Sequence, residues 1–333
     1  MTELRWVARA ALAAVLSASF AATPACAQGF PSKPIKAIVP LAAGGALDVM
    51  VRAIGKAQEE RGGPGFVVEN RAGANTILAA NACKAAAPDG YTICLLSRSS
   101  VSLNPEIYKN LSYDPLKDFE PITNVAFAQQ VVILNRAVPV GTFQELVAYS
   151  KTNPDKLNYG SFGVGGDTHL VMEWLKYVTG AKLTHIPYKG ASEALMAFTA
   201  GDVQVMYLIV GNLDLVRQIN EGEVKGLLVP GAARNPLIPN VPSFAESGLP
   251  PNEDTILTWF GFFAPKGTPP DIVQALNKEL TAIINTPAFR DKFLTPRGFT
   301  AVGNSVADFA AFLPNDRKAA AGMVAISGIR LEQ

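Results

Sequence analysis

Two glycines between a buried-strand pattern and a helical pattern constrain this chain more than any other stretch. The apolar run Ile35 to Val39 predicts a strand, and the pattern from Asp48 to Glu60 predicts a helix. Gly44 and Gly45 stand between them, so main-chain N–H groups are left bare where the helix begins. Those groups and the helix dipole favour an anion at this point. An ordinary turn is the competing interpretation, because glycine is common in turns.

A second stretch, Tyr159 to His169, has the same chemistry. It is rich in glycine and leads into an apolar helical pattern. One such loop alone is better explained as a turn, but two of them, far apart in sequence, predict two jaws that grip one anionic ligand. The residues predicted to contact it are Ala42, Ala43, Gly44, Gly45 and Asp48 in the first loop, and Gly163, Val164, Gly165, Gly166, Asp167, Thr168 and His169 in the second.

Strand and helix patterns alternate through the first third of the chain. The expected elements are strand 35–39, helix 48–60, strand 66–69, helix 76–86 and strand 91–96. This βαβαβ order predicts a parallel sheet with helices on both faces. Ligands bind at the carboxyl edge of such sheets, where Arg98, Ser99 and Ser100 follow the third strand. These three residues therefore join the predicted binding site.

A second α/β run follows the first. Its expected elements are strand 127–135, helix 143–151, strand 157–159, helix 169–178, strand 183–186, helix 192–199, strand 203–208 and strand 226–229. A strand-like segment at 259–264 and helices at 271–284, 287–293 and 306–321 finish the chain. The fold class expected is α/β, with two lobes joined by two crossing strands near residues 128 and 257. Each lobe has a mostly parallel sheet flanked by helices, and the cleft between them can close on a ligand.

The tail helices have no sheet of their own, so they are expected to return to the first lobe. The predicted boundaries are residues 28–127 plus 258–333 for lobe 1 and residues 128–257 for lobe 2. Together the lobes account for the whole chain after its first 27 residues.

Residues 1–27 have the pattern of a cleavable signal peptide. Arg5 and Arg9 precede a short apolar segment, and Ala25-Cys26-Ala27 supplies small residues at the cleavage position. The apolar segment is too short to span a membrane. Lipid attachment at Cys26 is the second interpretation. Export to the periplasm is expected, and removal of the signal leaves equal numbers of acidic and basic residues, so nucleic acid is not an expected partner.

Two cysteines remain after the signal, Cys83 and Cys94. The first lies in a helical pattern and the second in the following strand, with a turn at Pro88-Asp89-Gly90 between them. An exported chain meets an oxidising compartment, so a structural disulfide is expected. A metal site would need further ligands nearby, and none stands there in the sequence, so no metal is expected.

Several short motifs, in their order and spacing, resemble the Bug family. The motifs are Phe30–Ile35, Pro40–Asp48, Val67–Ala74, Ala87–Thr92, Asn104–Pro105 and His185–Gly190. Bug proteins are TctC-type periplasmic solute-binding receptors of tripartite tricarboxylate transporters. The resemblance covers essentially the whole chain after the signal.

The resemblance implies a type II periplasmic binding fold and a small, usually carboxylated ligand. It implies that main-chain groups at Ala42 to Gly45 and at Gly163 to Thr168 hold the carboxylate, often through ordered waters. It implies delivery to a membrane transporter with one large and one small integral subunit, and neither catalysis nor a cofactor. We further expect a monomer.

Several positions depart from the usual family pattern. Leu41, Ala43 and Leu47 stand where Phe, Pro and Thr are common, and Gly166 stands where Ser or Thr is common. Leu208 takes the place of an acidic residue at a strand end and is included in the predicted site. Leu47 and Leu208 lead us to expect apolar pocket walls and a compact mono- or dicarboxylate with an apolar body.

Two single residues have more than one interpretation. Arg98 can pair with a second ligand carboxylate, lie in solvent at the rim, or pair with Asp48 or Asp167. His169 opens a helix after a glycine loop and is better explained as a structural hydrogen-bonding group than as a catalyst. No nucleophile has an evident place beside it in the sequence.

Three classes of function are compared. A binding protein is favoured. An enzyme has little support, because the sequence has two histidines, no G-x-S-x-G and no phosphate-loop lysine. A periplasmic sensor component, which presents its carboxylate to a membrane signalling protein, is the alternative that the sequence leaves open.

Overall fold

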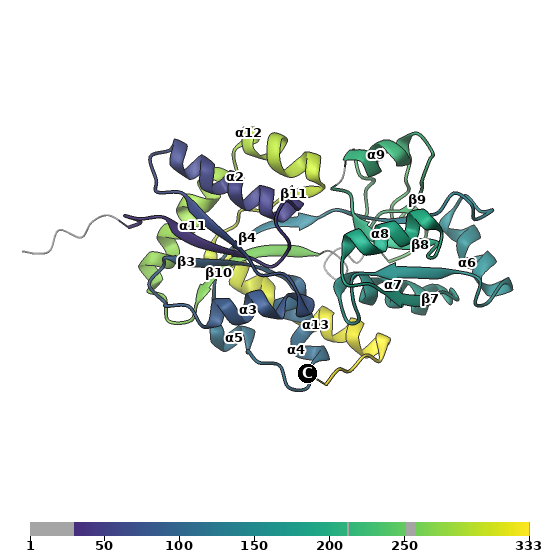
Figure 1. Cartoon of the computed structure of the whole chain (residues 1–333), viewed down its shortest axis with the longest axis horizontal. Helices are drawn as coiled ribbons and strands as arrows, with labels where there is room; N and C mark the ends of the chain where they lie inside the picture. The colour runs from purple at the N-terminus through teal and green to yellow at the C-terminus, as the bar shows by residue number, and fades with distance from the viewer. Residues whose placement is uncertain (1–29, 212, 251–257, 333) are drawn as a thin grey trace, which may run out of the picture.

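The computed structural model describes residues 30–211, 213–250 and 258–332. Its strands form two sheets that lie side by side, each with helices packed on its faces (Figure 1). We call each sheet with its helices a lobe, the first containing the six-stranded sheet and the second the five-stranded sheet. The predicted signal at 1–27 and the predicted crossing near residue 257 lie outside the described residues.

The sheet of the first lobe has the strand order β11-β4-β10-β3-β1-β2. Its strands are β1 (Ile35–Val39), β2 (Phe66–Asn70), β3 (Thr92–Ser97), β4 (Phe119–Ala128), β10 (Trp259–Pro265) and β11 (Phe299–Ala301). β1 is parallel to β2 and β3, as predicted, whereas β10 is antiparallel to β3 and β4. The parallel half of this sheet therefore presents three carboxyl ends at one edge.

Helices cover both faces of the first sheet. The helices are α2 (Ala46–Glu60), α3 (Ile77–Lys84), α4 (Asn104–Ile107), α5 (Pro115–Asp118), α11 (Pro270–Ile284), α12 (Pro287–Phe289) and α13 (Val306–Ser327). Side chains of α2 and α11 share one buried cluster with alternate residues of β1, and side chains of α3 and α13 share the cluster on the opposite face. This alternation is the expected result of side chains pointing to opposite faces along a strand.

The sheet of the second lobe has the order β7-β6-β8-β5-β9. Its elements are β5 (Gln130–Leu134), α6 (Phe143–Thr152), β6 (Asn158–Ser161), α7 (Asp167–Thr179), β7 (Thr184–Pro187), α8 (Ala191–Ala200), β8 (Val205–Ile209), α9 (Leu213–Asn220) and β9 (Lys225–Leu228). β6 is parallel to β7 and β8, and β5 is antiparallel to β8 and β9. Each sheet thus mixes parallel and antiparallel pairs.

The predicted strand 127–135 is wrong in one respect, because it is two strands. β4 ends in the first sheet at Ala128, and β5 begins in the second sheet at Gln130, so a single residue, Gln129, lies between the sheets at this crossing. Its backbone N–H donates to Gly298 O at 2.6 Å, and its carbonyl accepts from Val210 N–H at 2.8 Å. The crossing itself, predicted near residue 128, is therefore confirmed and is held on both sides.

The C-terminal helix α13 touches the cores of both lobes. Phe309 and Leu313 belong to a cluster of the first lobe, whereas Ala320, Met323 and Val324 belong to a cluster of the second. Figure 1 shows α13 running from beneath the first sheet toward the second lobe. The helix also extends six residues beyond its predicted end at 321, and the lobe boundaries stay predictions.

A disulfide joins Cys83 of α3 to Cys94 of β3, as predicted, with their Cα atoms 5.9 Å apart. Both cysteines are fully buried between the helix and the sheet. Across the described ranges, no helix is long and apolar enough to cross a membrane.

Candidate functional site

The two glycine loops lie where a strand of each lobe ends and a helix begins. The first connects β1 to α2, and the second connects β6 to α7. A hydrogen bond brings the second loop against the first lobe, since Asn75 Nδ2 donates to Gly165 O at 3.4 Å. The same amide group donates to Asn104 Oδ1 at 2.8 Å. The site is therefore built from both lobes.

The first loop is exposed to solvent, and the side chain of Asp48 binds it from the helix side. Gly44 has a left-handed φ of 81°, and its N–H donates to Asp48 Oδ2 at 2.9 Å. Gly45 begins α2 with extended backbone, and no side chain of the described residues caps this helix start. Residues 41–45 are all exposed, so the turn that leads into α2 is open to solvent.

Asp48 keeps a negative charge although it is buried. Burial acts to raise the pKa of its carboxyl group, but hydrogen bonds from Arg52 and from Gly44 outweigh burial and hold that pKa below its usual value. The Arg52 guanidinium lies 3.0 Å from Asp48 Oδ2, one helical turn further on. The charge behind the first loop is thereby neutralised.

The second loop has the same construction but is more buried. Gly163 and Gly165 have left-handed φ values of 130° and 75°, and Gly166 begins α7 with extended backbone. Within the described part of the chain, no side chain caps α7. Gly165 N–H donates to His169 Nδ1 at 3.0 Å. Val164 is the exposed member of the loop, whereas 165–169 are buried.

A third segment at this edge was missed by the sequence analysis. Ala74, Asn75 and Thr76 all have left-handed φ values, of 46°, 49° and 68°. Such a conformation costs free energy in residues other than glycine and persists where surrounding contacts impose it. Here Asn104 Nδ2 donates to Asn75 O at 2.9 Å, and Thr76 Oγ1 lies 2.7 Å from Ser100 Oγ. Its position after β2 was the signal that could have revealed it.

Arg98 is fully buried and joins the two lobes. Its Nε donates to Asp316 Oδ1 at 2.9 Å, and its NH1 lies 3.5 Å from Asp167 Oδ1. Of the interpretations left open, pairing with Asp167 is the one observed, whereas a position in solvent and a pair with Asp48 are wrong. Whether Arg98 reads a second carboxylate stays a prediction.

The ion cluster around Arg98 contains two carboxylates and one guanidinium. Trp259 Nε1 donates to the second oxygen of Asp316 at 2.9 Å, and the Thr258 hydroxyl donates to Asp167. Burial, together with the nearby Asp316 charge, raises the pKa of Asp167 despite the opposing effect of Arg98. Asp167 begins α7, so this cluster ties the second glycine loop to α13 and to β10.

The remaining predicted residues have a different role in this structure. Ser99 and Ser100 are buried just after β3, and the Ser100 hydroxyl contacts Thr76 of the left-handed segment. Leu208 packs in a core cluster of the second lobe, and Leu47 packs in a core cluster of the first. Both leucines are buried, and the expected apolar walls of the binding site stay a prediction.

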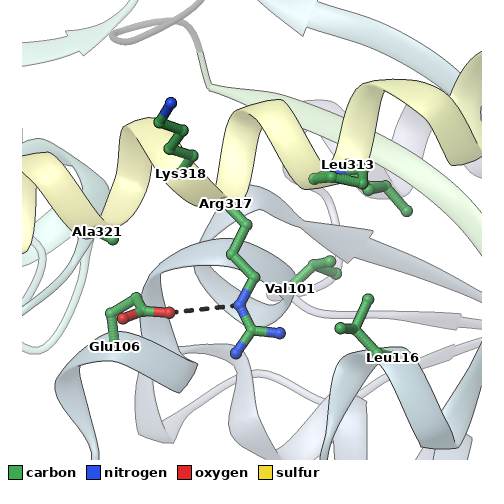
Figure 2. Close-up of a pocket in the computed structure, with 8 residues that line it drawn as sticks. Val101, Glu106, Leu116, Leu313, Arg317, Lys318 and Ala321 are labelled. Carbon is green, nitrogen blue, oxygen red and sulfur yellow. Dashed lines mark hydrogen bonds and ion pairs between the residues drawn. The ribbon is translucent and has the colours of Figure 1, made fainter.

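An apolar cavity beside α13 is separate from the glycine loops. It has a volume of about 280 Å³ and is lined by Val101, Glu106, Leu116, Leu313, Pro314, Arg317, Lys318 and Ala321. Figure 2 shows Arg317 reaching Glu106 across it, at 3.3 Å. No group of side chains that could hold a metal ion is found among the described residues.

Comparison with known proteins gives a consistent result over nearly the whole chain. The model of the tripartite tricarboxylate transporter family receptor matches residues 50–328. Protein BugT of Bordetella pertussis is 30% identical over 313 residues, covering 93% of this chain and 94% of BugT. A solved R. palustris protein with adipate has a TM-score of 0.82 at 28% identity, covering 91% of this chain and 100% of that one. MatC from Rhodopseudomonas palustris with bound malate has a TM-score of 0.77 at 27% identity, covering 89% and 100%.

Proposed function

The chain belongs to the receptor family of tripartite tricarboxylate transporters, and on that premise we propose that it captures a small carboxylate between its two glycine loops. The family consists of periplasmic solute-binding receptors, and similar structures hold adipate and malate. The proposed ligand is therefore a compact mono- or dicarboxylate.

One observation carries this proposal. Two helices, α2 and α7, begin at uncapped glycine turns in different lobes, and Asn75 brings the lobes together beside the second turn. A carboxylate placed between them accepts hydrogen bonds from N–H groups that have no partner within their helices. Both helix dipoles add to the attraction.

The site residues proposed for ligand contact are those of the first loop, Ala42 to Gly45, and those of the second, Gly163 to Thr168. In both loops the contact is with main chain, so side-chain identity sets the shape of the site rather than its charge. Asp48 and His169 accept hydrogen bonds from the loop glycines, and their contact with the ligand stays a prediction.

We propose a periplasmic location after cleavage of the signal, action as a monomer, and delivery to a transporter with one large and one small membrane subunit. A binding role without turnover follows from the family. The alternative, presentation of the loaded receptor to a membrane signalling protein, uses the same site. Uptake and growth of a deletion strain on the ligand separate the two roles, because a strain defective only in sensing regains uptake when the transporter is expressed constitutively.

The test of ligand binding is a thermal-shift screen of the mature protein over mono-, di- and tricarboxylates, aromatic acids and amino acids. A ligand that binds only the folded state at 100 times its Kd stabilises it by about 2.7 kcal/mol. Adipate is compared with its uncharged diamide, which keeps the carbon chain but lacks the anionic ends. A shift with the acid alone supports the proposal, and equal shifts with both contradict it. NMR spectra of the incubated ligand detect any turnover.

A further inference from the structure

The two glycine loops share one hydrogen-bonding pattern, although Gly163 has a positive φ and its counterpart Ala42 does not. In the first, Gly45 N–H donates to Ala42 O at 3.4 Å, and in the second, Gly166 N–H donates to Gly163 O at 3.3 Å. The preceding glycines, Gly44 and Gly165, have φ values of 81° and 75°. The equivalence runs from Ala42 and Gly163 through the first turn of each helix.

In this alignment His169 takes the place of Asp48. Gly44 N–H donates to the side chain four residues ahead, Asp48, and Gly165 N–H donates to the side chain four residues ahead, His169. The next turn of each helix also matches, with Arg52 beside Asp48 and Glu173 beside His169. The order of the residue types is reversed between the loops. In the first loop the acidic Asp48 is followed by the basic Arg52, and in the second the imidazole of His169 is followed by the acidic Glu173.

The hydrogen bond from Gly165 defines the tautomer of the His169 imidazole. Nδ1 accepts a hydrogen bond, so the proton of the neutral ring is on Nε2, which lies 3.9 Å from Glu173 Oε1. Neutral imidazole needs no counter-ion, whereas the Asp48 carboxylate has Arg52. Each loop therefore receives an acceptor that adds no net negative charge behind the place where an anion binds.

We propose that His169 is a positioning residue, whose neutral Nε2–H form holds the second glycine loop open to a carboxylate and releases the loop when Nδ1 takes up a proton. This inference rests on the proposed function for its ligand, but not for its hydrogen bond. A second proton on the ring must go to Nδ1. The protonated Nδ1–H would then face the Gly165 N–H, and two donors cannot form a hydrogen bond with each other. The loop loses its support, although the ring gains a charge that attracts anions.

Burial and the neighbouring His185 outweigh the Glu173 carboxylate and favour the neutral ring. His185 of β7 stacks on it with ring centres 3.6 Å apart, and Tyr159 of β6 lies beside both. Glu173 and Lys176 face it from its own helix, paired with each other at 2.7 Å. Burial, and then the neighbouring His185, lower the pKa of His169 to about 4. Burial likewise lowers the pKa of His185 to about 4.

The sign of the pH effect follows from these values. Between about pH 4 and pH 6.5 the unfolded chain binds protons at these histidines and the folded chain does not. Their contribution to stability is therefore complete above pH 6.5 and falls as the pH falls toward 4. The competent loop is half populated at the pKa of His169 and about a quarter populated half a pH unit lower.

The first test needs no ligand. Long-range ¹H–¹⁵N NMR of the ligand-free protein at pH 7.5 should show His169 with its proton on Nε2 and an unprotonated Nδ1. A proton on Nδ1, or a charged ring at this pH, overturns the proposal. Because this measurement requires no carboxylate, it decides the inference even if the binding proposal fails.

The second test compares His169→Gln with His169→Leu. The glutamine carbonyl can accept from Gly165 N–H without titrating, whereas leucine fills the space and accepts nothing. By calorimetry with adipate at pH 7.5, we expect the glutamine variant within about threefold of the wild type and the leucine variant weaker by about tenfold. Equal losses in both variants overturn the positioning role. Circular dichroism confirms folding, and if the leucine variant fails to fold, the glutamine variant and the NMR result still decide.

The third test measures adipate affinity between pH 7.5 and pH 3.5. Protonation of the ligand affects both proteins equally. The ratio of wild-type to His169→Gln affinity therefore reports the effect of His169 protonation alone. That ratio should fall about twofold at pH 4.0 and about fourfold at pH 3.5, as the competent fraction falls. A constant ratio, or one that rises because the charged ring attracts the anion, overturns the release of the loop. A wild type that binds neither adipate nor malate contradicts the proposed ligand class instead.

Discussion

A glycine at a helix start can be required for its backbone conformation or for the space that a side chain would fill. At Gly45 only the second reason applies. Its φ of −73° suits any residue, unlike the left-handed φ of Gly44. An added Cβ would approach Ala42 O at 3.3 Å, which is close but does not meet another element. A side chain at this position therefore requires the Ala42 carbonyl to shift by a few tenths of an ångström, an adjustment within the loop itself.

Gly45→Val is expected to reduce carboxylate binding by at least about 100-fold, because the branched side chain occupies the space beside the free N–H groups. The free energy of unfolding should change by less than about 1 kcal/mol. Calorimetry and urea unfolding measure the two quantities. Gly141→Val, just before α6 at the far end of β5, has room for its Cβ and serves as the matched control. A variant that binds normally would place the ligand elsewhere.

Arg98 shows what a sequence leaves undetermined at this scale. Its position after β3 was predictable from the strand pattern, but its partner Asp316 lies 218 residues away. Nothing local to either residue specifies that pair, which exists because α13 packs on the first sheet. The glycine loops were predictable because their geometry is set by residues within one turn of each other.

Arg98→Ala is expected to lower the free energy of unfolding by about 3–5 kcal/mol even without ligand, since it leaves Asp167 and Asp316 buried without their shared cation. Urea unfolding at pH 7 measures the loss. Arg217→Ala removes a half-exposed partner of Glu221 on α9 and should cost no more than about 1 kcal/mol. Similar losses in both variants would mean that burial adds nothing to the Arg98 cluster.

Elements with a clear period were predictable, and those with a conflicting signal were not. Strands β1, β2, β3, β6, β7 and β8 lie within two residues of their predicted positions. Most of β4 was missed, because Pro121 and Glu120 argue against a central strand. The ladder between β4 and β10 is irregular between Phe262 and Phe263, and Pro121 pairs there. An interruption in the pairing thus accommodates the proline.

Helix α3 and strand β3 are joined by the disulfide predicted from their spacing. The bridge closes a loop of eleven residues in sequence separation. Constraint of that loop in the unfolded chain contributes about 3 kcal/mol. Reduced protein should therefore unfold at lower urea concentration than oxidised protein, with alkylated Cys83 and Cys94 identified by mass spectrometry. Thiol counting on the unreduced, denatured protein checks the bridge directly, and two free thiols would contradict it.

The whole molecule is two lobes connected at Gln129, with the second glycine loop against the first lobe. The contact between Asn75 and Gly165 belongs to the state in which the lobes meet. A ligand changes the balance between open and closed states only if it binds one of them more tightly. The two-lobed arrangement was predictable from the repeated α/β pattern, whereas the contacts between lobes were not, because they join residues distant in sequence.

Adipate, or another ligand found by the screen, is expected to reduce the radius of gyration measured by small-angle scattering. The reduction follows because a carboxylate held by both loops favours the closed state. Gly45→Val with the same ligand should keep the larger radius. An unchanged profile for the wild type at saturation would indicate that the pocket is already formed in the free protein.

Helix α13 has a consequence for how the chain acquires its structure. The second lobe is composed mainly of residues between 130 and 250, yet Ala320, Met323 and Val324 complete its core. A ribosome adds those residues after every strand of both sheets, so both cores are still incomplete when the last strand has been made. Both cores therefore receive side chains from one helix, and removal of α13 is expected to destabilise both lobes.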